Sequence, residues 1–202
     1  MRKAVLISIQ PKWCELIVNG KKSIEVRKNR PKIDTPFKCY IYCTNDRSDL
    51  WVLRERLRKF YGDKIASLCN AKDVGGATKA NGKVIGEFVC DTFVFDKTFG
   101  HDPLFNGAAC MSEIDVAWYC CQSPMYGWHI SDLKVYDKPK ELSEFNAICP
   151  YKKPEGTRMD VDCPCDKYTW DFDEKTGKSF CTRRITRPPQ SWCYVEERED
   201  NA

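Results

Sequence analysis

The sequence lacks an apolar run of the roughly 20 residues that a membrane-spanning helix needs. Its beginning is basic and then apolar, as in a secretory signal, but residues 4–9 are too few and Gln10 and Pro11 interrupt them. We therefore expect a cytoplasmic protein without a membrane segment. Hydrophobic residues make up 42% and charged residues 31% of the 202 positions, which excludes a disordered chain.

The net charge is small, and the sequence has only two histidines. Lysine and arginine exceed aspartate and glutamate by only 33 to 29, so the total charge permits an anionic partner without requiring one. A nucleic-acid site must then come from local clustering, and the first 32 residues hold nine basic side chains against two glutamates. One of the two histidines, His129, lies in a strand-like stretch, where it serves either packing or proton transfer.

Thirteen cysteines are an unusual number, and an odd one. Several, such as Cys39, Cys43 and Cys90, lie inside apolar strand-like runs, where a free thiol behaves as a small hydrophobic side chain. Without a secretory signal, reduced thiols explain them better than a disulfide scaffold.

Hydrophobic patterning predicts short strands with two or three intervening helices. The elements do not alternate regularly as βαβ units, which favours the α+β class and most simply a small barrel with helical decoration. Gly86 within an apolar strand suggests a bulge or a close backbone approach. We predict strands at 4–9, 23–27, 37–44, 83–95 and 126–136, helices at 11–19, 50–61 (capped by Asp49) and 112–121, and a loop at 69–81.

The densest polar sequence follows the first predicted helix. Gly20 ends that helix, and the alternation of the next strand puts Ser23, Glu25 and Arg27 on one face together with Lys21. Lys22 would face the core with Ile24 and Val26, but we expect the turn at Gly20 to shift its register and bring it to the polar face. The alternative is that these side chains form a row of solvent-exposed ion pairs, which contributes little to stability and has no role in function.

These residues resemble a known family. Gly20, Lys22, Glu25 and Arg27 match, in type and spacing, the G-x-K-x-x-E-x-R signature of ASCH domains, named for activating signal cointegrator homology. The context is similar too, over about residues 3–145: a strand and a Pro-Lys-Trp helix before the motif, and Val-Ile-Gly-Glu-Phe and Tyr-Gly-Trp-His-Ile strands after it. The segment 188–195 resembles the ending of small ASCH proteins from phages and gut bacteria.

The resemblance implies a PUA-like mixed β-barrel and an association with RNA binding and RNA metabolism. On this basis we expect a barrel domain at 1–147, a cysteine-containing insertion or flap at 148–186, and a segment at 187–202 that returns to the barrel. Some members are hydrolases, including a class that deacetylates acetylated cytidine with a lysine, a threonine and a glutamate. Glu25 occupies the position of that threonine here, so Ser23 is the only hydroxyl in the motif.

Three functions remain open at this point. The first is binding of RNA or a nucleotide-like ligand, with Lys22 and Arg27 on phosphate or carbonyl oxygens and Glu25 orienting them or reading a base edge. The second is a hydrolase with Lys22 and Glu25 as the catalytic pair and Ser23 or water as nucleophile. The third is a protein-interaction module that uses the basic N-terminal face. The ligand-binding candidates are Lys12, Trp13, Lys21, Lys22, Glu25, Arg27, Trp128 and His129, with Gln190 as a weaker one; the two tryptophans either stack on a base or pack in the core.

A polar stretch near the C-terminus contains four more cysteines, Cys149, Cys163, Cys165 and Cys181. The stretch is too poor in apolar residues to form a core, and a structural zinc held by four thiolates would explain how it folds. Reduced thiols on an ordered flap, or one disulfide, are the alternatives, since Cys-x-Cys is a less usual zinc spacing than Cys-x-x-Cys.

Overall fold

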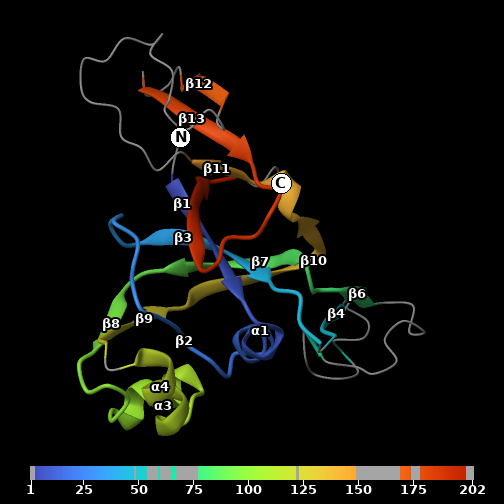
Figure 1. Ribbon diagram of the computed structural model, residues 1–202. Coiled ribbons are helices and arrows are strands. Elements are labelled where there is room, and N and C mark those ends of the chain that lie inside the picture. The colour runs from blue at the N-terminus through green and yellow to red at the C-terminus, as the bar shows by residue number, and fades with distance from the viewer. Residues whose placement is uncertain are drawn as a thin grey trace.

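The computed structural model describes residues 3–47, 49–53, 59, 65–66, 77–121, 123–148, 169–173 and 178–198. Within them the chain is a mixed α+β protein built mostly of strands, with three α-helices and one 3₁₀ turn, η1 (Leu142–Glu144), which confirms the predicted class (Figure 1). None of the helices in these ranges has the length and apolar character needed to cross a bilayer.

The largest sheet is built around β1 (Lys3–Ile9). β1 runs parallel to β3 (Phe37–Cys43) and antiparallel to β14 (Trp192–Glu196), the last described strand of the chain. Its odd-numbered apolar residues enter one core cluster and its even-numbered ones another, so both faces of the sheet are covered. The strand order is β10 (Ser131–Glu141), β7 (Lys83–Cys90), β3, β1, β14, β11 (Asn146–Ile148), β13 (Lys178–Arg184) and β12 (Thr169–Asp173).

A second, three-stranded sheet has the order β2 (Ile24–Arg27), β9 (Met125–His129) and β8 (Phe93–Asp96). One face packs on the large sheet: Trp128 is fully buried and its ring meets Phe37 of β3 edge-on at 6.1 Å between centroids. The described strands therefore enclose the core by packing two open sheets together, rather than by the closed barrel that the family resemblance implies.

Two short helices cover the other face of the second sheet. They are α3 (Pro103–Ala109) and α4 (Glu113–Cys120), which lie together at the bottom of Figure 1. Phe105 of α3 and Val116 of α4 are buried against Ile24 and Val26 of β2. α4 is predicted from the sequence and α3 is not, although Asp102 followed by Pro103 is a typical helix start and the Asp102 carboxylate caps the helix.

Two of the predicted strands each divide between the two sheets. Residues 83–95 form β7 in the large sheet and the start of β8 in the small one, with a break at Asp91 and Thr92. Residues 126–136 similarly belong to β9 and then β10. Continuous apolar alternation cannot show at which residue a strand changes its partners.

The helix predicted at 50–61 is wrong at its beginning. Residues 51–53 form β4 (Trp51–Leu53), the centre of a third sheet with β5 (Ile65–Ala66) and β6 (Ala77–Lys79). Residues 51–53 are all buried, so both faces of the segment are covered, which the one-sided stripe of a surface helix does not allow. Asp49 forms an ion pair with Lys79 at 2.6 Å instead of capping a helix, and β6 lies inside the predicted loop. Residues 54–58 and 60–61 are outside the described residues.

Candidate functional site

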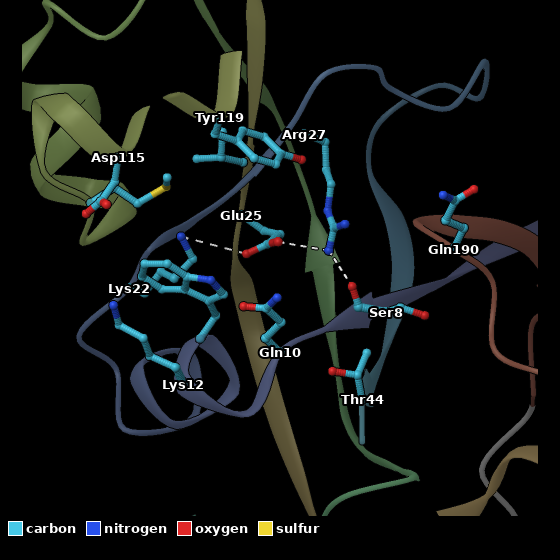
Figure 2. Close-up of a pocket in the computed structure, with 13 residues that line it drawn as sticks. Ser8, Gln10, Lys12, Lys22, Glu25, Arg27, Thr44, Asp115, Tyr119 and Gln190 are labelled. Atoms are coloured by element: carbon cyan, nitrogen blue, oxygen red, sulfur yellow. Dashed lines mark hydrogen bonds and ion pairs between the residues drawn. The ribbon is translucent and has the colours of Figure 1, made fainter. Parts of the chain in front are cut away.

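A cavity of about 440 Å³ opens where the ends of β1 and β3 approach β2 and α4. Figure 2 shows polar side chains from these elements pointing into it. It is lined by Ser8, Gln10, Lys12, Trp13, Lys22, Glu25, Val26, Arg27, Thr44, Met111, Asp115, Tyr119 and Gln190.

A helix and a glycine turn bring Lys22 to this cavity. Helix α1 (Pro11–Val18) starts with proline at its first position and buries Cys14, Ile17 and Val18. The backbone then turns at Gly20, which has a φ of +74°, a conformation that glycine adopts without steric cost. Lys22 therefore precedes β2, and its side chain joins those of Glu25 and Arg27 in the cavity, as the sequence analysis expects from a register shift.

Lys22, Glu25 and Arg27 form one buried ionic network. The Glu25 carboxylate lies 2.9 Å from Nη2 of Arg27 and 3.7 Å from Nζ of Lys22 (Figure 2). These three residues are only 3%, 5% and 9% exposed, so the network is not the exposed ladder of ion pairs considered above. One carboxylate between two cations leaves an excess positive charge at the cavity wall.

Arg27 is held mainly by the protein itself. Its Nη2 donates a hydrogen bond to the Ser8 carbonyl at 2.6 Å, and Nη1 donates to the Ser191 hydroxyl at 3.3 Å. Its Nε is buried without a hydrogen-bond partner among the described residues. The guanidinium thus positions Glu25 and ties β2 to the segments around Ser8 and Ser191.

Lys22 is held less completely. Its Nζ donates one short hydrogen bond, 2.6 Å long, to the carbonyl of Ala109 at the end of α3. An ammonium group has three donors, so donors remain for an acceptor in the cavity. Burial lowers the pKa of Lys22 and the Glu25 carboxylate opposes that shift, so the side chain loses its proton more readily than an exposed lysine.

Trp13 forms an aromatic wall between two cations. The ammonium groups of Lys12 and Lys22 lie 4.6 Å and 4.9 Å from the centre of its ring. The ring is partly exposed at the cavity, as a stacking surface requires.

The opposite wall comes from α4 and the turn before it. Met111, Asp115 and Tyr119 line the cavity, and the Tyr119 side chain reaches toward Arg27 at the rim (Figure 2). Burial raises the pKa of the Tyr119 hydroxyl, so this group loses its proton less readily than that of an exposed tyrosine. No motif in the sequence marks these residues as part of a site; the one signal near them is the capping pattern at Ser112, which places α4.

Several candidates lie elsewhere. Lys21 and Ser23 are exposed and do not line the cavity. Trp128 is fully buried in the core, so packing, and not stacking on a ligand, is its role in this structure. His129 lies at the surface with its Nδ1 2.6 Å from the Asp91 carboxylate, and this hydrogen bond is the main cause of the lowered pKa of Asp91.

The proposed zinc ligands are not tested by the structure. Cys149, Cys163 and Cys165 lie outside the described residues, and Cys181 is described only by its backbone in β13. The described part of the chain holds no group of three or more side chains suited to a metal ion.

Comparison with known proteins finds similarity to one family. The crystal structure of ASCH from Zymomonas mobilis is similar with 18% identity over 69% of this chain and 73% of that chain, at a TM-score of 0.46. Two mutants of that protein share 18% and 19% identity over 70% of this chain and 77% and 75% of theirs, at TM-scores of 0.46 and 0.47. No curated protein matches the chain. The ASCH domain model matches residues 7–90, which include the whole motif at 20–27, so this part of the chain is similar to ASCH domains.

Proposed function

We propose that the cavity binds RNA or a nucleotide-like anion, with Lys22 as the principal contact to a phosphate or carbonyl oxygen. The observation that carries the proposal is the buried network of Lys22, Glu25 and Arg27, whose excess positive charge lies at the wall of an open cavity. Burying an ionised group is costly unless it has a partner of opposite charge. The buried excess cation at the cavity wall therefore favours binding of an anion. The association of ASCH domains with RNA supports the same ligand class.

The remaining lining residues suit a nucleotide. Trp13 offers a ring on which a base or ribose can stack, and Lys12 next to it offers a mobile cation for a phosphate. Gln10, Thr44 and Gln190 can exchange hydrogen bonds with the edge of a base. Arg27 contributes by holding Glu25 in place, because two of its nitrogens already bond to protein atoms.

A neighbouring pair of lysines gives a matched test. Lys22→Met removes a buried cation from the cavity, whereas Lys21→Met removes an exposed one that lies outside it. A hydrogen bond to a charged group contributes about 1.5–3 kcal/mol, so we expect Lys22→Met to weaken binding of uridine 5′-monophosphate and of a short RNA at least about tenfold in calorimetric titrations. Lys21→Met should change it less than about twofold.

Equal losses in the two variants would show that general surface charge binds the ligand. Unchanged binding in Lys22→Met would place the site elsewhere. Glu25→Gln is a poorer first test, because it leaves two cations uncompensated and breaking a buried ion pair costs about 3–5 kcal/mol. Its thermal unfolding must therefore be measured alongside its binding.

A hydrolase is the second candidate, and the lowered pKa of Lys22 favours it. A lysine that gives up its proton readily can act in proton transfer next to a carboxylate 3.7 Å away. In amide hydrolysis, water would attack the carbonyl of an acylated base and release the acid and the exocyclic amine. Ser23 is exposed outside the cavity, so water is the nucleophile that this geometry favours.

Chromatographic assays of N-acetylated cytidine and of RNA distinguish the two candidates. Turnover by the wild type that is lost in Lys22→Met and Glu25→Gln but kept in Lys21→Met would establish the enzyme. Binding without turnover in the wild type would leave the protein a binder.

A further inference from the structure

A row of side chains leads from Arg27 in the cavity to β8, the outer strand of the second sheet as described. In the register of the strands, Arg27 of β2 is opposite Tyr126 of β9, and Tyr126 is opposite Phe95 of β8. Directly opposed residues of antiparallel strands lie on the same face of a sheet. The row therefore continues the face that carries Arg27, and it becomes more exposed along its length: Arg27 is buried, Tyr126 is half-buried and Phe95 is 42% exposed.

The aromatic rings along this row lie close to one another. The ring centroids of Phe95 and Tyr126 are 4.9 Å apart and the two rings are inclined to each other by 33°, a tilted arrangement in direct contact. Phe93 meets Tyr126 edge-on at 6.5 Å, with its own ring partly exposed. We call Phe93, Phe95 and Tyr126 the aromatic strip.

Exposed cations accompany each ring of the strip. The Arg30 guanidinium lies 5.2 Å from the centre of the Phe93 ring and 5.8 Å from that of Tyr126. The Lys97 ammonium lies 5.7 Å from the Phe95 ring. At the cavity rim, Lys28 lies 5.5 Å from the ring of Tyr119, a cavity-lining residue. The alternation of rings and cations thus begins at the cavity and follows the sheet outward.

Cation–π contacts at exposed sites are weak, and the stems of lysine and arginine are flexible. A nucleotide can therefore compete for both partners of each contact: its phosphate attracts the cation, and its base takes the ring face that the cation leaves. Single strands suit this surface because their bases are not paired, and rings combined with a basic groove are the common means of binding them. A protein partner would not need a cation beside every ring.

We propose that the aromatic strip binds the nucleotides of a single-stranded RNA that flank the one in the cavity. Phe95 and Tyr126 stack on bases, and Arg30 and Lys97 contact phosphates. This proposal rests on the proposed function, because the strip extends the same site. Figure 1 shows the path as β2, β9 and β8 lying side by side below the large sheet.

The test compares a long and a short probe. A fluorescein-labelled uridine octamer is titrated by anisotropy, and uridine 5′-monophosphate by calorimetry. Stacking on an aromatic side chain is strong enough that Phe95→Ala should weaken the octamer at least about fivefold while leaving the mononucleotide unchanged. Leu104→Ala is the matched control, since Leu104 is an 85% exposed apolar residue on α3, away from the strip.

The salt dependence of octamer binding measures the phosphate contacts separately from stacking. Each phosphate contact on a single strand contributes about 0.7 to the slope of log affinity against log salt, so Arg30→Ala and Lys97→Ala should each reduce the octamer's slope by about that amount. Equal octamer affinity in Phe95→Ala, Leu104→Ala and wild type would overturn the strip while the cavity proposal stands. If the wild-type protein binds neither the octamer nor uridine 5′-monophosphate, both the cavity proposal and this one are wrong. Equal affinity for a thymidine octamer would extend the ligand to single strands of DNA.

Discussion

At the scale of single residues, Lys22 has the most informative environment. Its ammonium is buried and donates a hydrogen bond to the Ala109 carbonyl. It also forms an ion pair with the Glu25 carboxylate and lies over the Trp13 ring. Because burial lowers its pKa, the cation is less stable in the fold than in the unfolded chain. The cost of that charge is fully present below the folded pKa and is relieved as the pH rises through it. A buried charge that carries such a cost is typical of residues that serve binding or catalysis.

The lowered pKa predicts an alkaline limit to binding. Lys22 holds an anion only while protonated, so affinity for uridine 5′-monophosphate should fall as the pH rises through the lowered pKa, below the pH of about 10.4 at which an exposed lysine titrates. Calorimetric titrations from pH 7 to 10 measure this fall. Lys21→Met should show the same profile as wild type, while Lys22→Met should have weak and nearly pH-independent binding. A wild-type affinity that stays constant to pH 10 would contradict the assignment.

At the scale of elements, β7 shows how a single glycine permits sheet pairing. A Cβ on Gly86 would lie 2.5 Å from the Lys134 carbonyl oxygen and 3.2 Å from Cα of Val135, both backbone atoms of β10. The pairing with β3 is also irregular here, since Ile41 is opposite Gly86 but Tyr42 is opposite Val84. The sequence prediction of a bulge or close approach at Gly86 is thus confirmed.

Replacing this glycine should weaken the sheet. We expect Gly86→Ala to lower the free energy of unfolding by about 1–3 kcal/mol, because the backbone of β10 cannot move away cheaply. Gly107→Ala is the control: it lies in α3 with no atom within 4 Å of a new Cβ, and should be neutral or stabilising by up to about 1 kcal/mol. Urea unfolding measures both, and equal effects would contradict the close approach.

The pair of helices α3 and α4 has a larger role than covering a sheet. α3 offers the Ala109 carbonyl to Lys22, and the turn and helix that follow supply Met111, Asp115 and Tyr119 to the cavity. The insertion between β8 and β9 therefore completes a site whose charged residues come from near residue 20.

At the scale of the whole molecule, the N-terminal and C-terminal parts of the chain complete one another. β14 pairs with β1, and Ser191 just before it bonds to both Arg27 and the backbone of Ser8. The cavity is thus built from segments far apart in sequence, and its geometry depends on the global fold. The cysteines report on the same fold, since Cys14, Cys39, Cys43 and Cys90 are buried as reduced core residues.

Thiol alkylation provides a test at this scale. The thiolate is the reactive form, and burial raises the pKa of Cys90 to about 12 and that of Cys39 well above its usual value. Iodoacetamide at pH 8 should therefore modify the exposed Cys121 long before Cys39 or Cys90, as followed by peptide mass spectrometry. Cys39 should become reactive only with global unfolding in urea. Equal native rates at Cys39 and Cys121 would contradict the described core.

Local features can be read directly from the sequence: the strand at residues 4–9, the helix that starts with proline, the glycine turn, and a motif whose alternation separates Ile24 and Val26 from Glu25 and Arg27. These follow from backbone preferences and periodicity within a few residues, which is also why the family signature is readable there. Lys22 could be assigned to the polar face because Gly20 is only two residues away.

Which distant residues meet depends on the packing of the whole fold. Ser8, Thr44, Tyr119 and Gln190 reach the motif from four other segments, and no short-range pattern records such contacts. Trp128 and Trp13 look alike in sequence, yet the first is sealed between two sheets and the second borders the cavity. The same holds for residues 51–53, at the beginning of the helix predicted at 50–61, because strand pairing with residues 65–66 and 77–79 outweighs a local helical stripe there. Burial and charge compensation are properties of the assembled fold. They explain why the charged residues of the motif form a buried network at a cavity and not a row of exposed ion pairs.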